Sequence, residues 1–293
     1  MHIEGIKVFC DLAETGSFTK AAHANGVTQS AVSQLVASME RQLRCLLVER
    51  SKKKFRLTRE GECLRDHGKQ IVHAFQQLQA SLQEARCVIS GSIRVATIYS
   101  VGLHDLPPYL KLFLREFPTV NVHVQYLRAN EVYEDVLSNA ADIGLVACPS
   151  RDPRLQIVPL RSEQMVVIMS PGHPLAAVRP LPTQGLEGQR FIAFEPDIPT
   201  RTAIDRFLRE RGVKVRTVME FDNIETVKRA VEVEAGIAIV PKSAAQTEVA
   251  RHTLLAVPLA DATLERPLAA IHRMDKVLTP PMIRFLKTLG GDS

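Results

Sequence analysis

The chain has 293 residues, of which 45% are hydrophobic and 24% are charged, with a net charge of +5. This length predicts about two domains of ordinary size, and the composition excludes a wholly disordered chain. No apolar run approaches the roughly 20 residues of a membrane-spanning helix, and the first residues carry no secretory signal. We therefore expect a cytoplasmic protein with no membrane partner.

The positive charge is concentrated near the amino terminus. Residues 1–90 hold 13 Lys and Arg against 9 Asp and Glu, whereas residues 91–293 hold 24 against 23. Between positions 41 and 59, eight basic residues face one acid, Glu49. Such clustering is typical of a protein that binds a polyanion, although an ordinary solvated surface is the alternative.

The five cysteines are scattered along the chain without any Cys-x-x-Cys pair. An odd, dispersed set without an export signal is typical of reduced thiols. We therefore expect mostly packed thiols, no disulfide framework and no zinc site. The cysteines are Cys10, Cys45, Cys63, Cys87 and Cys148.

The first sixty residues predict three helices. Apolar positions within residues 3–14 fall on one helical face, and Gly16-Ser17 ends that helix and caps the next. The second helix passes through the small pair Ala21-Ala22. Thr28 can then cap a third helix over residues 29–43.

The third helix has an unusual outer face. One side is apolar, while the opposite side is short, polar and uncharged, unlike an ordinary solvated helix rich in Lys and Glu. Gln and Ser can hydrogen-bond to base edges, and two helices joined by a tight turn, the second with such a face, form a helix-turn-helix. We predict contacts to double-stranded DNA from Thr28, Gln29, Ser30, Ser33 and Gln34.

Residues 46–57 alternate as in a β-hairpin with a strongly basic tip. A hairpin of this kind is expected to lie along the phosphate backbone, where cations add salt-sensitive affinity and orient the recognition helix. We expect these phosphate contacts from Arg50, Lys52, Lys53 and Lys54.

Residues 9–61 contain a series of short motifs, which are Gly16-Ser17-Phe18, Ala21-Ala22, Thr28-Gln29-Ser30-Ala31-Val32-Ser33, Glu49-Arg50 and Arg56-Leu57-Thr58-x-x-Gly61. With these motifs the segment resembles the winged helix-turn-helix of the LysR-type transcriptional regulators. Arg44 stands where this family usually has Gly, and Val48 where it usually has Phe. The resemblance implies a regulator that binds promoter DNA.

A long helix is predicted from Thr58 to about Ile89. Its apolar residues recur at spacings of 7, 4, 3, 4, 3 and 4, a repeat typical of paired helices. They are Leu64, Ile71, Phe75, Leu78, Leu82, Ala85 and Ile89. Burial against its own domain is the alternative. We expect self-association as a dimer that reads a two-part DNA site, and the resemblance implies the same linker helix, with tetramers common.

Beyond Gly91 the pattern changes to alternating strands and helices. Strands at 93–98, 120–127 and 142–146 are separated by helices at 106–117 and 130–139, and a similar series recurs further along the chain. This order predicts an α/β domain with a mostly parallel sheet. The two series suggest two lobes with a cleft between them.

The resemblance extends over this second domain, which is similar to the LysR-type effector-binding domain and, through it, to periplasmic solute-binding proteins. The motifs are Leu110-x-x-Phe113-x-x-x-Phe117-Pro118-x-Val120, Ala141-Asp142-Ile143-Gly144, Ser170-Pro171-Gly172-His173-Pro174-Leu175 and Ala235-Gly236-Ile237-Ala238-Ile239-Val240-Pro241. We expect a winged helix-turn-helix at 1–58, a linker and dimerisation helix at 59–89 and an effector-binding domain at 90–293, with lobe one at 90–161 and 267–293 and lobe two at 162–266.

Open α/β sheets bind ligands beyond the carboxyl ends of their strands, where helix amino termini favour anions. We therefore expect a small anionic metabolite as effector, and no other cofactor or metal. Simple helix capping by Thr200 and Asn223 is the alternative. The candidates, several of which match effector contacts of the family, are Ser100, Val101, Arg128, Thr200, Arg201, Thr202 and Asn223.

Other functions are disfavoured. The chain has no Gly-x-Ser-x-Gly elbow, phosphate-binding Gly-x-x-x-x-Gly-Lys loop or His-Glu-x-x-His motif, and His173 is typical of a turn, so we do not expect an enzyme. A solute-binding or carrier protein with an attached DNA-binding module is the alternative function. A redox sensor of the peroxide-sensing type is disfavoured because no cysteine follows Cys148.

Replacing Lys53 with Ala is expected to weaken binding to all DNA sequences alike, because a phosphate contact carries no sequence information. The slope of log affinity against log salt concentration should flatten by about 1. Fluorescence anisotropy with any labelled duplex at several salt concentrations measures this slope, with Lys111→Ala as the matched control. An unchanged slope would place residue 53 away from the phosphates.

Overall fold

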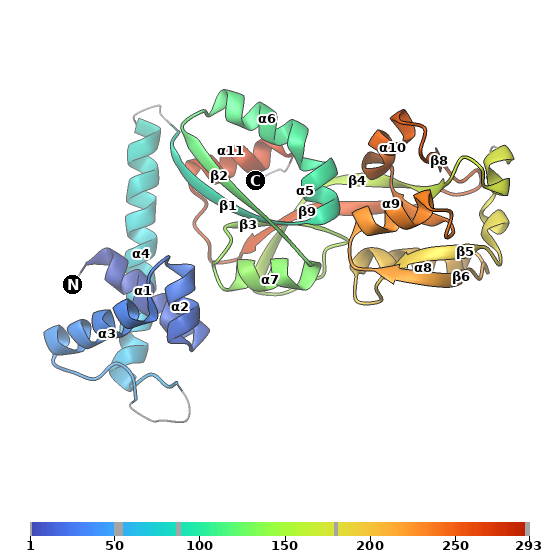
Figure 1. Ribbon diagram of the computed structural model, residues 1–293. Coiled ribbons are helices and arrows are strands. Elements are labelled where there is room, and N and C mark those ends of the chain that lie inside the picture. Colours follow the sequence, from blue (N-terminus) through green and yellow to red (C-terminus); the bar gives the residue numbers. More distant parts are fainter. Residues whose placement is uncertain (1, 50–54, 86–88, 179–180, 291–293) are drawn as a thin grey trace.

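The computed structural model describes residues 2–49, 55–85, 89–178 and 181–290. A small helical domain, one long helix and a two-lobed α/β domain follow one another (Figure 1). Arg50, Lys52, Lys53 and Lys54, which we predict to contact phosphates, lie outside the described residues. Within the described ranges, no helix combines the length and apolar composition that crossing a membrane requires.

The helical domain consists of α1 (Ile3–Thr15), α2 (Phe18–Ala24) and α3 (Gln29–Leu43), which pack around a single apolar core. Gly16 ends α1 with a left-handed φ of 60°. The hydroxyl of Thr28 accepts a hydrogen bond from the backbone N–H of Ala31 at the start of α3. The sequence predicts both caps because they depend on local residues only.

The turn after α3 uses a residue that is poorly suited to it. Arg44 has φ 53° and ψ 35°, a left-handed conformation that costs a non-glycine residue roughly 1–2 kcal/mol. The LysR-type regulators that the sequence resembles usually have Gly at this position, and Arg44 adopts the left-handed conformation that Gly would adopt. Beyond the turn, the carboxylate of Glu40 accepts a hydrogen bond from the N–H of Leu47 at 2.8 Å.

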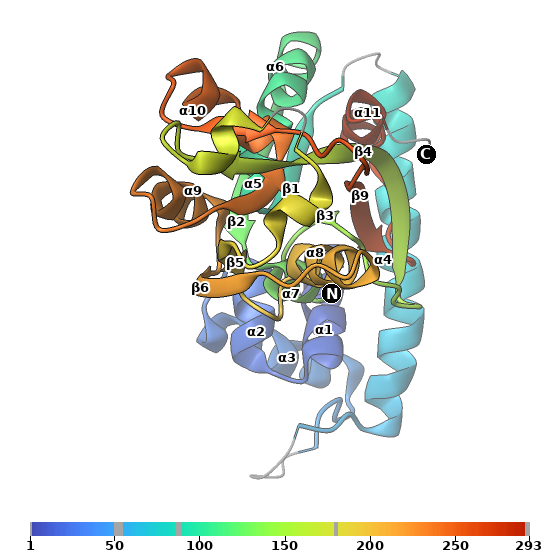
Figure 2. The same cartoon turned by 90° about the vertical axis from the view of Figure 1, so that its right-hand side faces the viewer.

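The long helix α4 (Arg59–Ala85) packs its first half on α1 and continues past lobe one (Figures 1 and 2). A Cβ at Gly68 would lie only 2.9 Å from the side chain of Ile6, so glycine allows this close approach. Further along, Ile71 and Leu78 are 46% and 53% exposed. The apolar stripe is thus only partly covered by its own chain.

Lobe one is built on three parallel strands. β1 lies between β2 and β3, and the helices α5, α6, α7 and α11 surround this sheet. Phe113 of α6 and Phe285 of α11 meet edge to face in the core, with ring centroids 5.1 Å apart. The bounds are β1 (Gly91–Ile98), α5 (Tyr99–His104), α6 (Leu106–Glu116), β2 (Val120–Leu127), α7 (Ala129–Leu137), β3 (Ile143–Ala147) and α11 (Pro280–Thr288).

Two long strands, β4 (Leu155–Met169) and β9 (Glu265–Arg273), pass between the lobes as an antiparallel pair. β9 also pairs antiparallel with β3. The expectation of a mostly parallel sheet therefore needs correction, because the chain returns from lobe two to lobe one along β9. Each of these two strands therefore runs from one lobe into the other. The domain boundaries that the sequence predicts stay a prediction.

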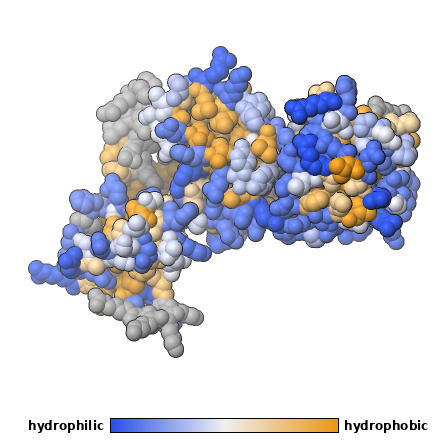
Figure 3. Space-filling view, viewed as in Figure 1, coloured by the Kyte–Doolittle hydropathy of each residue, from blue (hydrophilic) through white to orange (hydrophobic). Residues whose placement is uncertain are grey.

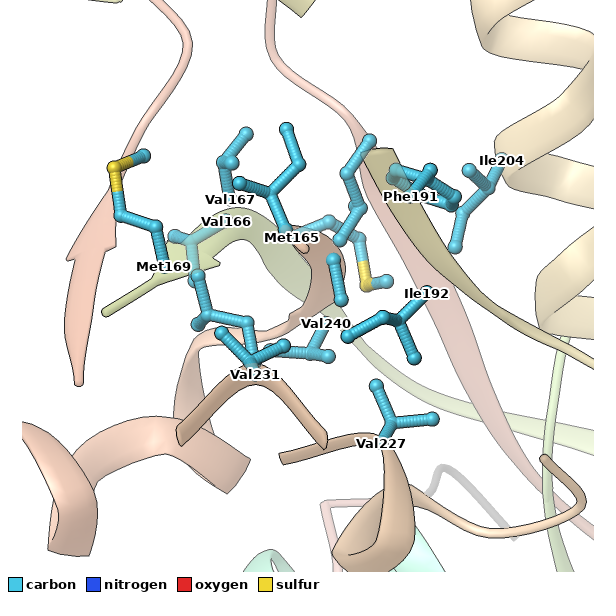
Figure 4. Close-up of a cluster of buried hydrophobic side chains, with 14 of the residues drawn as sticks. Met165, Val166, Val167, Met169, Phe191, Ile192, Ile204, Val227, Val231 and Val240 are labelled. Atoms are coloured by element: carbon cyan, nitrogen blue, oxygen red, sulfur yellow. The ribbon is translucent and has the colours of Figure 1, made fainter. Parts of the chain in front are cut away.

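Lobe two encloses its own apolar core, in which β4 is the central element. Met165, Val167, Phe191 and Val240 meet there, and Val227 reaches the same core from α9 (Figure 4). β4 pairs with β7 and β8, whereas β5 and β6 form a separate parallel pair. The bounds are β5 (Arg190–Phe194), α8 (Pro199–Glu210), β6 (Arg216–Phe221), α9 (Ile224–Glu232), β7 (Ala238–Pro241), α10 (Gln246–Ala250) and β8 (Leu255–Val257), with 3₁₀ helices at Pro174–Ala177, Thr183–Leu186 and Lys242–Ala245.

Asp142 joins three segments of lobe one. Its carboxylate accepts hydrogen bonds from the backbone N–H of Arg94 at 2.8 Å, from the Arg94 guanidinium at 2.9 Å and from Lys276 Nζ at 2.6 Å. Burial raises the pKa of this carboxyl, but the hydrogen bonds and positive charges of Arg94 and Lys276 outweigh burial and lower its pKa to about 2.

Replacing Asp142 with Asn is expected to lower the free energy of unfolding of the full chain at pH 7 by about 2 kcal/mol. A depressed folded-state pKa stabilises the protein above the unfolded-state value of 3.8 and ceases to do so as the pH falls toward about 2. The difference between wild type and variant in urea unfolding should therefore shrink between pH 4 and pH 2.

Asp152→Asn is the matched control. The pKa of Asp152 is also lowered to about 2, by hydrogen bonds from Arg154, but this pair lies at the surface. Solvent screening makes such pairs weak, so this variant should lose much less stability. Equal losses in the two variants would contradict a structural role for Asp142.

Candidate DNA interface and effector cleft

Helix α3 presents the polar face that the sequence predicts. Thr28, Gln29, Ser30 and Gln34 are exposed and Ser33 is half-buried, while the opposite side of the helix is buried in the core of the domain. The amide Nε2 of Gln29 lies 3.2 Å from the hydroxyl of Ser33. The five predicted residues therefore share one accessible surface that carries hydrogen-bond donors and acceptors.

The end of α3 and the segments that follow it carry exposed positive charge. Within the described part of residues 41–59, all four basic side chains are exposed. A neutral, hydrogen-bonding helix face beside exposed cations combines base contacts with phosphate contacts. The four residues are Arg41, Arg44, Arg56 and Arg59.

A cleft lies between the two lobes, at the carboxyl ends of parallel strands from both. β1, β2 and β3 reach it with Ile98, Leu127 and Ala147, and β5 reaches it with Phe194. Open α/β sheets bind ligands at this place. The polar lining consists of Ser100, Arg128, Asn130, Asp197, Thr200, Asp222, Asn223 and Arg266.

Three of the predicted effector contacts, Ser100, Thr200 and Asn223, meet in this cleft. Ser100 and Thr200 are buried beneath its surface. Helix capping is the alternative role for Thr200 and Asn223. Asn223 does cap a helix, because its side-chain oxygen accepts from the N–H of Thr226 at 3.1 Å. Thr200 does not cap α8, so its hydroxyl is placed for another partner.

Arg128 lines the cleft, but acids of lobe two already hold its guanidinium. Nη2 lies 2.5 Å from a carboxylate oxygen of Glu195 and 3.0 Å from one of Asp197, and Nη1 lies 3.8 Å from Asp222. Hydrogen bonds to Glu195 and Asp197 raise the pKa of Arg128. The residue therefore bridges the two lobes at the cleft, and an anionic ligand would compete with these carboxylates for it.

The remaining three predicted contacts are not among the residues that line this cleft, and their role as effector contacts stays a prediction. Val101 is buried in the core of lobe one. Arg201 binds Asp205 and Glu220, each at 2.7 Å. Thr202 borders a different groove. Successive residues of a helix point about 100° apart, so only Thr200 of this run faces the cleft.

Arg266, the most buried charged residue of the cleft, is not among the residues that the sequence predicts. Its side chain is 2% exposed, and Nη2 lies 2.7 Å from the carboxylate of Glu163. Nη1 donates to the hydroxyl of Thr200 at 3.3 Å. An arginine at the start of an apolar strand is a weak signal, because its partner on β4 is about a hundred residues away in the sequence.

The described residues show no group of three or more His, Cys, Asp or Glu that could hold a metal ion. The four cysteines within them are free thiols. Burial raises the pKa of Cys10 and of Cys148, whereas Cys63 is exposed. His173 caps a 3₁₀ turn, accepting from the N–H of Leu175.

A winged helix-turn-helix followed by a linker helix and a two-lobed domain with a cleft defines a DNA-binding protein with a separate ligand-binding domain. The family model described as the LysR substrate binding domain matches residues 88–292. The model described as a bacterial regulatory helix-turn-helix protein of the lysR family matches residues 3–62. The chain belongs to the LysR family and is a DNA-binding transcriptional regulator.

Relatives match over nearly the whole chain. The HTH-type transcriptional regulator CysL of Bacillus subtilis is 26% identical over 93% of this chain and 91% of its own. A full-length OxyR point variant from Pseudomonas aeruginosa has a TM-score of 0.71 at 22% identity and covers 99% of this chain and 93% of its own. The regulatory domain of CcmR of Synechocystis PCC6803, in complex with 2-PG, has a TM-score of 0.62 at 24% identity and covers 68% of this chain and 96% of its own.

Proposed function

We propose that this regulator binds promoter DNA as a homo-oligomer and that a small molecule with an anionic group, bound in the cleft between the lobes, alters that binding. The observation that carries the proposal is the joint presence of an accessible polar face on α3 and a separate cleft lined by Ser100, Thr200 and Arg266. A ligand changes DNA binding only if it favours one arrangement of the subunits over another.

The chemistry of the cleft supports an organic acid as effector. Apolar side chains such as Leu127, Phe194 and Ile224 can cover an organic body. Hydroxyls of Ser100 and Thr200, with the guanidinium of Arg266, can donate hydrogen bonds to an acidic group. The structural relative CcmR is in complex with 2-PG, which supports a small ligand at this fold. We propose no further cofactor and no catalytic role.

Self-association is supported by apolar surface on two elements. Ile71 and Leu78 are exposed and belong to the apolar stripe of α4 that we predict to pair with a second helix. A second apolar area covers α5, α6 and the neighbouring end of β2, where Leu103, Leu112 and Tyr126 are exposed (Figure 3). Exposed apolar area of this kind marks protein interfaces. We propose a dimer formed through α4, and a tetramer where the second area pairs as well, working in the cytoplasm with its DNA.

Replacing Ser33 with Glu is expected to abolish sequence-specific binding, because a bulky acid would meet base edges and phosphates. A lost base contact costs about 1–3 kcal/mol, so the affinity for DNA upstream of the protein's own gene should fall about 10- to 100-fold or more. Footprinting and anisotropy measure it. Ser150→Glu, at an exposed position of the effector domain, is the control, and a retained footprint for Ser33→Glu would move base recognition off α3.

Small carboxylates and phosphorylated acids are expected to include one compound that raises the melting temperature of the full chain, since a ligand of the folded state stabilises it. Thr200→Val should remove most of this shift because it deletes a hydroxyl in the cleft. Thr202→Val, outside the cleft, should retain it. Each shift is measured against the variant's own melting temperature, and equal shifts in both variants would place the ligand elsewhere.

A further inference from the structure

An ion pair connects the DNA-binding domain directly to lobe one. Glu14, in the last turn of α1, accepts a hydrogen bond at 2.5 Å from Nη1 of Arg273 and another at 3.1 Å from Nη2. Arg273 is the last residue of β9. We call this two-pronged pair the clasp. Such parallel hydrogen bonds fix orientation as well as distance.

The arginine of the clasp is held in place from its own domain. Asp275 accepts from Nε at 2.9 Å and from Nη2 at 2.7 Å, and the carbonyl of Leu137 accepts from Nη1 at 3.4 Å. The Arg273 side chain is only 16% exposed and that of Glu14 23% exposed. Because the guanidinium is fixed in advance, less side-chain entropy is lost when it binds Glu14 than in an ordinary surface pair.

Little apolar packing would replace the clasp if it broke. The hollow between α1, α4 and lobe one is lined mostly by polar and charged side chains, among them Lys7, Asp11, Asn139 and Lys276. Polar interfaces between domains of one chain allow relative motion unless specific contacts hold them. The clasp is such a contact between the two domains.

Helix α7 connects the clasp to the cleft. Arg128, at the amino-terminal cap of α7, binds the acids of lobe two. At the other end, the carbonyl of Leu137 accepts from Arg273, and the side chain of Asn139 accepts from Lys276 at 2.6 Å. A short helix moves as one rigid element, so displacement at its cleft end is transmitted to the clasp end.

We propose that the clasp docks the DNA-binding domain on lobe one and that α7 makes this docking depend on whether Arg128 holds the two lobes together. The docking goes beyond the proposed function. Only the link between the clasp and the cleft rests on the proposed function.

Hydrogen–deuterium exchange of the full chain tests the docking without DNA or effector. The reporter is the N–H of Gly16, which donates to the carbonyl of Leu12 at the end of α1 beside Glu14. In Arg273→Gln and in Glu14→Gln its exchange should be about 5-fold faster, since a charge-assisted hydrogen bond between the domains is lost. Glu14 also binds Nζ of Lys69 on α4 at 2.7 Å, so Glu14→Gln loses both contacts, and the double variant should exchange no faster than Glu14→Gln alone.

Two controls separate the clasp from general destabilisation. Arg154→Gln removes a lobe-one arginine from its exposed pair with Asp152 and should leave Gly16 unchanged. The N–H groups of the central strand β1 should keep their protection in every variant, which shows that lobe one remains folded. Unchanged exchange at Gly16, or additive effects in the double variant, would overturn the clasp.

The link along α7 has its own test. Arg128→Gln should accelerate exchange at Gly16 in the wild-type background and have no further effect in Arg273→Gln. If Arg128→Gln leaves Gly16 unchanged while Arg273→Gln accelerates it, the docking stands and the link to the cleft is overturned. Neither result depends on DNA binding or on an effector, so failure here is distinguishable from failure of the proposed function.

Discussion

The buried ion pair between Arg266 and Glu163 fixes the two strands that pass between the lobes. One partner lies on β9 and the other on β4, and each side chain is almost fully enclosed. Leaving either charge buried without its partner would be strongly destabilising, so the strands must stay in register where they cross. Arg266 also donates to Thr200 at the start of α8. Its guanidinium therefore connects the two crossing strands to lobe two and to the floor of the cleft.

The contacts that close the cleft are of a different kind. Arg128 reaches the acids of lobe two in a partly exposed position, and His104 of α5 lies 2.7 Å from Glu225 of α9. Such polar contacts exchange readily with water and with ligand groups. The ion pair of Arg266 and Glu163 fixes the strands where they cross, whereas the polar contacts at the cleft can be replaced. The two lobes can therefore change their separation without unfolding. The contact between the DNA-binding domain and lobe one is also polar, because it is made by the clasp and not by an apolar core.

Sequence predicts best what depends on neighbouring residues. The third helix is expected at residues 29–43 and is observed at Gln29–Leu43, because its cap and apolar spacing are local. The family and the two-lobed fold follow from extended motifs. Arg266 and the acids around Arg128 could not be predicted, because they meet through strand pairing and lobe closure between distant segments. Thr200 lines the cleft and Thr202 does not, a difference that the sequence does not show because a motif marks where a helix begins but not which of its first residues faces a cleft.

We propose that a ligand in the cleft changes how the regulator binds DNA. The most direct measurement is a footprint of the full-length protein on the DNA upstream of its own gene, with and without a compound whose stabilising effect depends on Thr200. We expect the protected region or the bending of the DNA to change with the compound in wild type and to stay the same in Thr200→Val. An identical footprint and affinity in wild type, at saturating compound, would contradict it.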